Sequence, residues 1–174
     1  KSNRAWMMTS PAGSPELRRV LAAEYRADPS DVLIVSGGQQ GLVFTMRTLA
    51  EPGSTVITES PSYPGAILAA QSAGLTIASV PADKDGIIVE RLADALERTR
   101  ARVIYLQPSY ANPTGAVLNP ERRTQVLELA AQHGAFIIED DWARNLGIDG
   151  RTPPALITED ANGHVVTVTT LSKA

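Results

Sequence analysis

The sequence AFIIEDD at residues 135–141 decides the fold, because an unbroken apolar run that ends in three carboxylates predicts a strand with both faces covered. A segment of helical period at 120–133 comes directly before it. Asn119 followed by Pro120 is typical of a helix start, and Gly134 is typical of a helix end. A helix that leads straight into a buried strand indicates an α/β domain with parallel strands.

The same alternation of short apolar runs and longer helical segments continues on both sides of this stretch. It predicts an α/β fold in three layers, α/β/α, around a mixed but mostly parallel sheet. Helices are expected near 15–26, 39–50, 63–73, 89–99 and 120–133, and strands at 32–35, 55–58, 76–80, 103–106, 135–138 and 165–168. No repeat or linker divides the chain, so we expect residues 1–12 to form an arm or loop and 13–174 to belong to one domain.

Composition excludes several classes of protein. The chain has 174 residues, 43% of them hydrophobic and 20% charged, and it contains no apolar run near the roughly 18 residues of a membrane span. A net charge of −3 with scattered basic residues gives no nucleic-acid footprint, and the lack of cysteine excludes disulfides and thiolate chemistry. We therefore expect a cytoplasmic protein.

The chain opens on Lys1 and closes at Ala174, which we interpret as a piece of a longer protein.

A glycine-rich loop at residues 36–41, SGGQQG, follows a predicted strand and opens a predicted helix. Glycine permits close approach of the backbone, and the free N–H groups of a helix N-terminus attract anions, so a phosphate is the expected ligand. The loop has no lysine and does not match the nucleotide-triphosphate motif. The alternative is a tight strand-to-helix turn without a ligand.

Two further segments follow the predicted strands at 103–106 and 135–138. Asn112 stands before Pro113, which favours an extended backbone and leaves the Asn amide free at the sheet edge where α/β folds bind ligands; the alternative is a simple turn. The consecutive acids Glu139, Asp140 and Asp141 repel one another, so at least one needs a cation or hydrogen-bond donor. A helix cap or a metal site are the alternatives, but no metal is expected because neither histidine has ligand-like spacing.

A lysine with hydroxyl neighbours stands next to the last residue of the sequence. Thr170, Ser172 and Lys173 follow the last predicted strand. A lysine in a desolvated pocket can act as a nucleophilic amine and form a Schiff base with a carbonyl group, and hydroxyls suit phosphate contacts. The alternative is an ordinary surface lysine.

Together these four segments resemble a known family. Their order, with 28 residues from Asn112 to Asp140 and 33 from there to Lys173, is similar to the large domain of fold-type I enzymes that use pyridoxal 5′-phosphate (PLP). The likeness is to the class I and II aminotransferases, and within them to the branch with aminoadipate and kynurenine aminotransferases and the MocR-type (GntR-family) regulators. It implies a partial PLP-binding large domain that is cut before a smaller C-terminal domain.

The resemblance implies a role for each matching residue. Gly38, Gln39 and Gln40 would hold the cofactor phosphate, helped by Thr170 and Ser172.

The remaining matches concern the cofactor ring. Tyr63 would stack on the ring, and Asn112 would donate to its phenolic oxygen. Asp140 would pair with the pyridine nitrogen, and Lys173 would form the Schiff base and move the α-proton. The sequence departs from the family after Asp140, where Trp142 and Ala143 stand in place of the usual tyrosine.

The resemblance implies an aminotransferase that moves amino groups between an amino acid and a 2-oxo acid, and it implies a homodimer. An alternative is the effector-binding domain of a MocR/GntR-type transcription regulator, which would contact DNA only through a preceding domain. A third hypothesis is another PLP reaction, such as a lyase or decarboxylase, because one cofactor frame serves many reactions.

Overall fold

The computed structural model describes residues 10–148, 150 and 152–173, and the chain divides into two units, residues 1–36 and 37–174. The expected arm at 1–12 therefore falls mostly outside the described residues. The first unit contains the helix α1 (Pro15–Tyr25) and the short 3-10 helix η2 (Pro29–Asp31). Ser14 caps α1 by accepting a hydrogen bond from the Leu17 amide, as expected at a helix start.

The strand predicted at 32–35 is wrong. This segment has no regular secondary structure and is not part of the sheet, and its Ile34 amide donates to the Ala12 carbonyl. Its apolar residues have the composition of a strand, yet a strand also requires a neighbour with which it forms a ladder.

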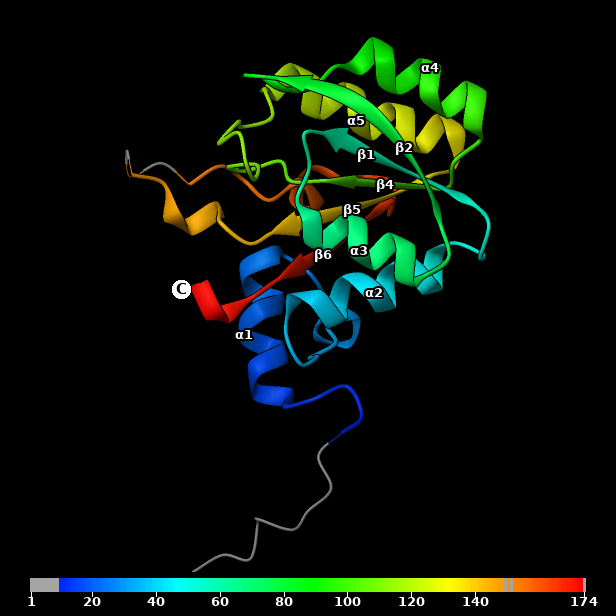
Figure 1. Cartoon of the computed structure of the whole chain (residues 1–174). Helices are drawn as coiled ribbons and strands as arrows, with labels where there is room; N and C mark the ends of the chain where they lie inside the picture. Colours follow the sequence, from blue (N-terminus) through cyan, green and yellow to red (C-terminus); the bar gives the residue numbers. More distant parts are fainter. Residues whose placement is uncertain (1–9, 149, 151, 174) are drawn as a thin grey trace, which may run out of the picture. The chain divides into compact units, whose positions relative to one another are not determined.

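The second unit is built on one six-stranded sheet (Figure 1). Its strands are β1 (Thr55–Ser60), β2 (Thr76–Asp83), β3 (Gly86–Ile87), β4 (Val103–Leu106), β5 (Phe136–Asp141) and β6 (Val165–Thr169). They lie in the order β3-β2-β1-β4-β5-β6. Only β3 is antiparallel to its neighbour, with which it forms a hairpin that the sequence did not predict.

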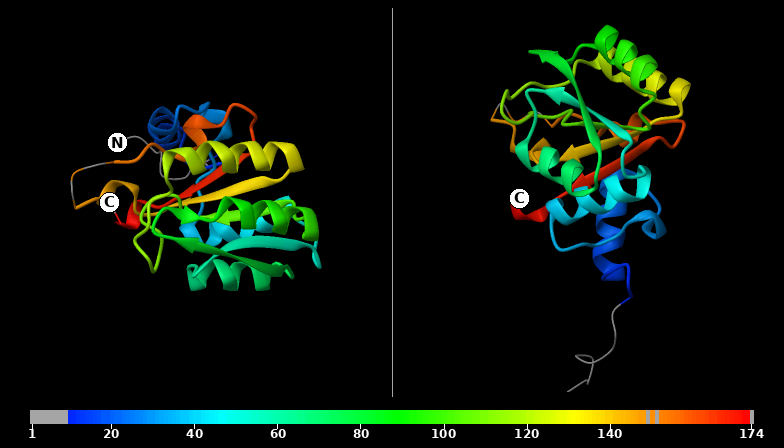
Figure 2. Two further views of the ribbon diagram at one scale, coloured as in Figure 1. Left: turned by 90° about the horizontal axis from the view of Figure 1, so that it is seen from above. Right: turned by 45° about the vertical axis from the view of Figure 1, so that its right-hand side comes forward.

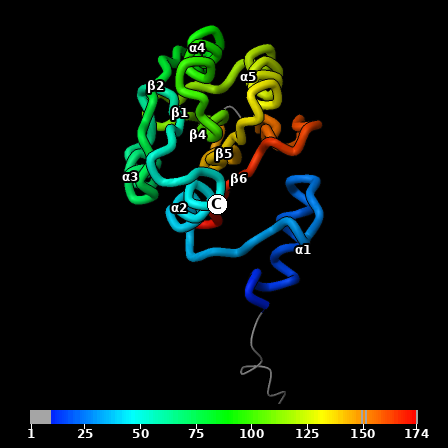
Figure 3. The backbone as a smooth tube through the Cα atoms, turned by 90° about the vertical axis from the view of Figure 1, so that its right-hand side faces the viewer, coloured from blue at the N-terminus to red at the C-terminus, as the bar shows by residue number. Residues whose placement is uncertain are grey.

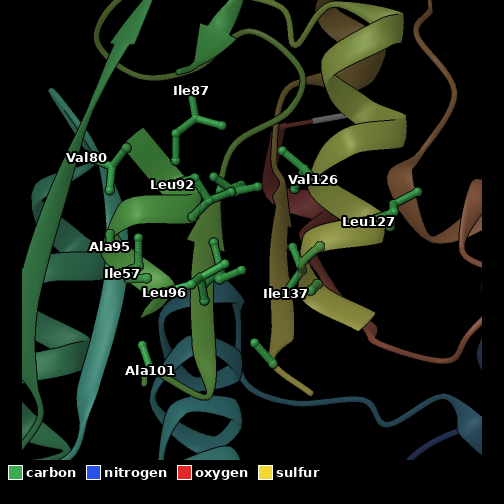
Figure 4. Packing of buried hydrophobic residues seen from close by; sticks show 14 of the residues in the cluster. Ile57, Val80, Ile87, Leu92, Ala95, Leu96, Ala101, Val126, Leu127 and Ile137 are labelled. Carbon is green, nitrogen blue, oxygen red and sulfur yellow. The ribbon is translucent and has the colours of Figure 1, made fainter. Parts of the chain in front are cut away.

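Helices cover both faces of this sheet (Figures 2 and 3). On one face, α2 (Gly38–Leu49) and α3 (Pro64–Ser72) bury a core that includes Met46 and Ile138. On the other face, α4 (Val89–Thr99) and α5 (Pro120–His133) pack against Ile57 and Ile137, as Figure 4 shows in detail. These three layers confirm the predicted α/β/α fold. Short 3-10 helices follow at η3 (Arg144–Leu146), η4 (Leu156–Glu159) and η5 (Leu171–Lys173).

The parallel strands determine where polar side chains can meet. β1, β4, β5 and β6 all end at the same edge of the sheet, where open α/β folds bind ligands. The end of β6 also lies beside the start of α2 (Figure 3), since a Cβ built on Gly38 would lie 3.9 Å from the Thr170 Cβ. Within the described part of the chain, no helix is both long and apolar enough to cross a membrane.

Candidate functional site

A cavity of about 260 Å³ opens at the carboxyl ends of the strands. All of its walls belong to the second unit and come from five separate stretches of sequence. Its lining residues are Gly38, Gln39, Leu42, Tyr63, Gln107, Asn112, Asp140, Trp142, Thr169, Thr170, Ser172 and Lys173.

The first wall is the N-terminus of α2. Gly37 precedes the helix with φ of 98°, a conformation that favours glycine, and it provides no side-chain cap for the first amides of the helix. Across from it, the hydroxyls of Thr170 and Ser172 lie 2.9 Å apart. Uncapped helix amides and two hydroxyl groups at one end of a cavity form a suitable site for an anion such as phosphate.

The two glutamines of this loop differ in position. Gln39 lines the cavity, and its side-chain amide donates to the Gly65 carbonyl at 2.8 Å, which ties the start of α2 to the start of α3. Gln40 is not among the lining residues.

Tyr63 forms a second wall at the start of α3. Its ring lies so close to Gly65 that a Cβ at that position would overlap the ring atoms. Gly65 therefore leaves the space that the Tyr63 ring occupies, and Tyr63 presents an aromatic side chain to the cavity.

Asp140 is the acidic group of the cavity, at the end of β5 and only 7% exposed. Its Oδ2 accepts two hydrogen bonds, one from the Tyr105 hydroxyl at 2.6 Å and one from the Gln107 side-chain amide at 3.0 Å. Burial raises the pKa of the Asp140 carboxyl, and the two hydrogen bonds oppose this only in part. A cation placed against Asp140 would therefore stabilise its charged form.

The donor Tyr105 is fully buried on β4. Burial is the main cause that raises the pKa of its phenol, and the nearby Asp140 charge adds to it. Tyr105 thus stays neutral and keeps its proton for the bond to Asp140.

The three consecutive acids are separated by the pleat of β5, because successive side chains point to opposite faces. Glu139 points away from the face of Asp140 and accepts hydrogen bonds from the Leu156 amide at 2.5 Å and the Thr167 hydroxyl at 2.6 Å. Asp141 forms a buried ion pair with Arg144 at 2.7 Å. Glu139 and Asp141 are thus bound to other groups of the protein, by hydrogen bonds and by an ion pair, respectively.

Lys173 lies on η5 at the cavity mouth and is exposed. Trp142 lines the cavity as well, while Ala143 is buried. Among the described residues, the buried indole N–H of Trp142 has no hydrogen-bond acceptor.

The cavity thus brings together every predicted site residue except Gln40. Sequence reasoning missed Leu42, Gln107 and Thr169. Gln107 could have been found from the strand pattern, because it follows Tyr105 by two residues and so lies on the same face of the sheet. In the described ranges, no three His, Cys, Asp or Glu side chains cluster as metal ligands would.

Fold and cavity together define an open α/β domain with a polar cavity at the carboxyl edge of its sheet. The chain belongs to the aminotransferase class I and II family, whose sequence profile matches residues 2–174.

Individual relatives include both enzymes and regulators. The chain is 39% identical over 145 residues to the uncharacterized HTH-type transcriptional regulator YdfD of Bacillus subtilis, covering 83% of this chain and 30% of the relative. It is 35% identical over 144 residues to the 2-aminoadipate transaminase of Thermus thermophilus, covering 83% of this chain and 36% of that enzyme. The chain thus spans about a third of the length of these curated relatives.

Solved structures of aminotransferases have the same fold. The α-aminoadipate aminotransferase LysN of Thermus thermophilus, complexed with N-(5′-phosphopyridoxyl)-L-leucine, superimposes with a TM-score of 0.91 at 32% identity. The match covers 99% of this chain and 46% of that enzyme.

Proposed function

We propose that the protein containing this chain is a PLP-dependent aminotransferase, which transfers amino groups between an amino acid and a 2-oxo acid. The observation that carries the proposal is the single cavity onto which Asn112, Asp140 and Lys173 converge beside the uncapped start of α2. The family assignment and the phosphopyridoxyl adduct bound to LysN support PLP as the ligand.

The residues present fit this cofactor. Asp140 is a buried carboxylate with a raised pKa whose described partners, Tyr105 and Gln107, are both neutral. A protonated pyridine nitrogen provides the cation that such a group favours. The phosphate would bind at the α2 N-terminus with Thr170 and Ser172.

The other contacts follow from the cavity lining. Tyr63 would cover one face of the ring, and Asn112 would donate to the ring oxygen. When bound, PLP supplies an electron sink for the substrate carbanion. Lys173 would hold the cofactor through its Nζ, and the same amine would then remove and return the substrate α-proton.

Borohydride reduction of the full-length protein tests this proposal. We expect a yellow protein on addition of PLP, and after reduction we expect mass spectrometry to find the phosphopyridoxyl group on Lys173. Lys173→Arg should abolish labelling, while Lys84→Arg serves as the control because Lys84 is exposed and lies outside the cavity. A label on another lysine, or no PLP binding, would refute the proposal.

A second candidate is the effector-binding domain of a MocR/GntR-type transcription regulator. The observation that favours it is the 39% identity to an HTH-type regulator, joined by 31% identity to the probable rhizopine catabolism regulatory protein MocR of Rhizobium meliloti. The sequence before Lys1 discriminates the two, because a regulator carries a basic helix-turn-helix segment there. Sustained conversion of an amino acid and a 2-oxo acid by the full-length protein would favour the enzyme, and PLP-dependent DNA binding would favour the regulator.

A further inference from the structure

Gln107 connects two walls of the cavity that are far apart in sequence. It directly follows β4 and is 3% exposed. Its side-chain NH₂ donates to Asp140 Oδ2 at 3.0 Å, and its side-chain oxygen accepts from the Asn112 backbone amide at 2.8 Å. One amide group thus binds the acid of the cavity at one end and the loop that carries Asn112 at the other.

The backbone of Gln107 is fixed as well. Its amide donates to Glu59 Oε1 at 2.8 Å, a side chain at the end of β1 that is itself 4% exposed. Gln107 therefore has partners on β1, on β5 and in the loop that carries Asn112. A buried polar group that is held by several hydrogen bonds has little freedom to reorient.

The chemistry of the side chain matters as much as its place. A neutral amide carries a donor and an acceptor on one rigid plane, which neither a carboxylate nor an apolar side chain offers. Because Gln107 and Tyr105 both donate to Oδ2, the described bonds leave Asp140 Oδ1 for a ligand in the cavity.

We propose that Gln107 is a positioning residue. It holds Asp140 and Asn112 in a fixed arrangement, so that they can contact the ring nitrogen and the ring oxygen of the cofactor. The inference rests on the proposed PLP-binding function and extends it to a residue that touches both cofactor contacts. The two side-chain hydrogen bonds of Gln107, the donor arm to Asp140 and the acceptor arm to Asn112, can be tested separately. Gln107→Met removes both arms, whereas Gln107→Glu is isosteric and retains the acceptor for Asn112.

The acceptor arm is tested without cofactor, by amide hydrogen exchange of the full-length protein with overlapping peptides. We expect faster exchange of the Asn112 amide in Gln107→Met and wild-type protection in Gln107→Glu. Equal protection of this amide in wild type and Gln107→Met would overturn the acceptor arm.

The donor arm is tested by PLP titration followed by absorbance, with the ratio of variant to wild-type affinity taken at each pH. In Gln107→Glu the introduced carboxyl lies beside Asp140, so its pKa is raised, and it donates only when protonated. For Gln107→Glu we expect a PLP affinity near that of wild type toward pH 6 and a loss of about tenfold toward pH 9. For Gln107→Met we expect a loss of about tenfold at every pH. A ratio that does not change with pH in Gln107→Glu would overturn the donor arm.

Ser109→Ala is the matched control, because Ser109 lies in the same loop, is 1% exposed, and has a buried hydroxyl without a hydrogen-bond partner among the described residues. It should leave both the exchange of the Asn112 amide and PLP affinity unchanged. An equal loss of amide protection or of PLP affinity in Ser109→Ala would show that any substitution in this loop causes the effect. A wild-type protein that binds no PLP overturns the proposed function together with this inference. Wild-type binding with unchanged Gln107 variants overturns this inference alone.

Discussion

At the level of single residues, the role of a carboxylate depends more on the groups around it than on whether it belongs to Asp or Glu. Glu139, Asp140 and Asp141 are neighbours in sequence, yet only Asp140 lines the cavity. Glu139 holds the segment around Leu156, and Asp141 pairs with Arg144. The sequence indicates that such a cluster needs compensating partners, but it does not say which acid receives which partner.

Glu59 gives a pH-dependent prediction. Burial raises its pKa from 4.5 to about 7, so the folded protein holds this proton more tightly than the unfolded chain does. Stability from this group is therefore complete below pH 4.5 and is lost as the pH rises toward 7. Glu59→Gln retains the acceptor for the Gln107 amide and removes the charge. We expect it to stabilise the protein at pH 8 by about 3 kcal/mol and to have little effect at pH 5.

Urea unfolding of wild type and Glu59→Gln at the two pH values measures this difference. Glu97→Gln is the control, because Glu97 is exposed on α4. An equal effect of Glu59→Gln at pH 5 and pH 8 would contradict the expected titration.

Gly65 gives a prediction about the aromatic wall of the cavity. In Gly65→Ala the new methyl group meets the Tyr63 ring, and the ring is the mobile partner because it can rotate away. We expect a fall of about fivefold in PLP affinity, the worth of one aromatic contact, with little change in the melting temperature. Tyr63→Phe retains the ring and should bind PLP as wild type does. Unaltered affinity in Gly65→Ala would show that the ring position is unimportant.

At the level of elements, helix ends were predictable because their chemistry is local. Asn119 accepts from the Glu121 amide at 2.9 Å, and Gly134 ends α5 in the left-handed conformation. Asn119→Ala should therefore lower the free energy of unfolding by about 1 kcal/mol in urea denaturation. Asn119→Asp retains an acceptor at the N-cap and should stay near wild type, so a similar loss in both variants would argue against the cap.

Strands were less predictable than helices, since a strand depends on a neighbour that is distant in sequence. The apolar segment 32–35 was predicted as a strand and lies outside the sheet. The short strand β3 was not predicted, because two residues carry too little pattern to reveal a strand. The strands β1, β2, β4, β5 and β6 were found because their runs are longer.

At the level of the whole sheet unit, the strand order produces the site. β4 and β5 are neighbours in register, which brings Tyr105 and Gln107 to Asp140 across more than thirty residues of sequence. The family motifs predicted residues that line the cavity, among them Asn112, Asp140 and Lys173. They did not predict Gln107, because its role comes from bonds to other side chains rather than from a motif.

The same unit should show a trade-off between stability and function at Asp140. Without a cation beside it, a buried carboxylate with a raised pKa costs stability, so Asp140→Asn should leave the cofactor-free protein at least as stable as wild type at pH 7. Added PLP stabilises a protein that binds it, by mass action on the folded state. We expect PLP to raise the melting temperature of wild type by several degrees and that of Asp140→Asn much less.

Thermal unfolding with and without PLP, followed by circular dichroism in the full-length protein, measures both halves of this prediction. Asp141→Asn is the informative comparison, because Asp141 forms an ion pair with Arg144 and does not line the cavity. Removing that buried ion pair should lower the melting temperature with and without PLP, while the rise caused by PLP remains. The opposite pattern, in which Asp140→Asn is less stable without cofactor but responds fully to PLP, would make Asp140 a structural residue and assign the contact with the ring nitrogen elsewhere.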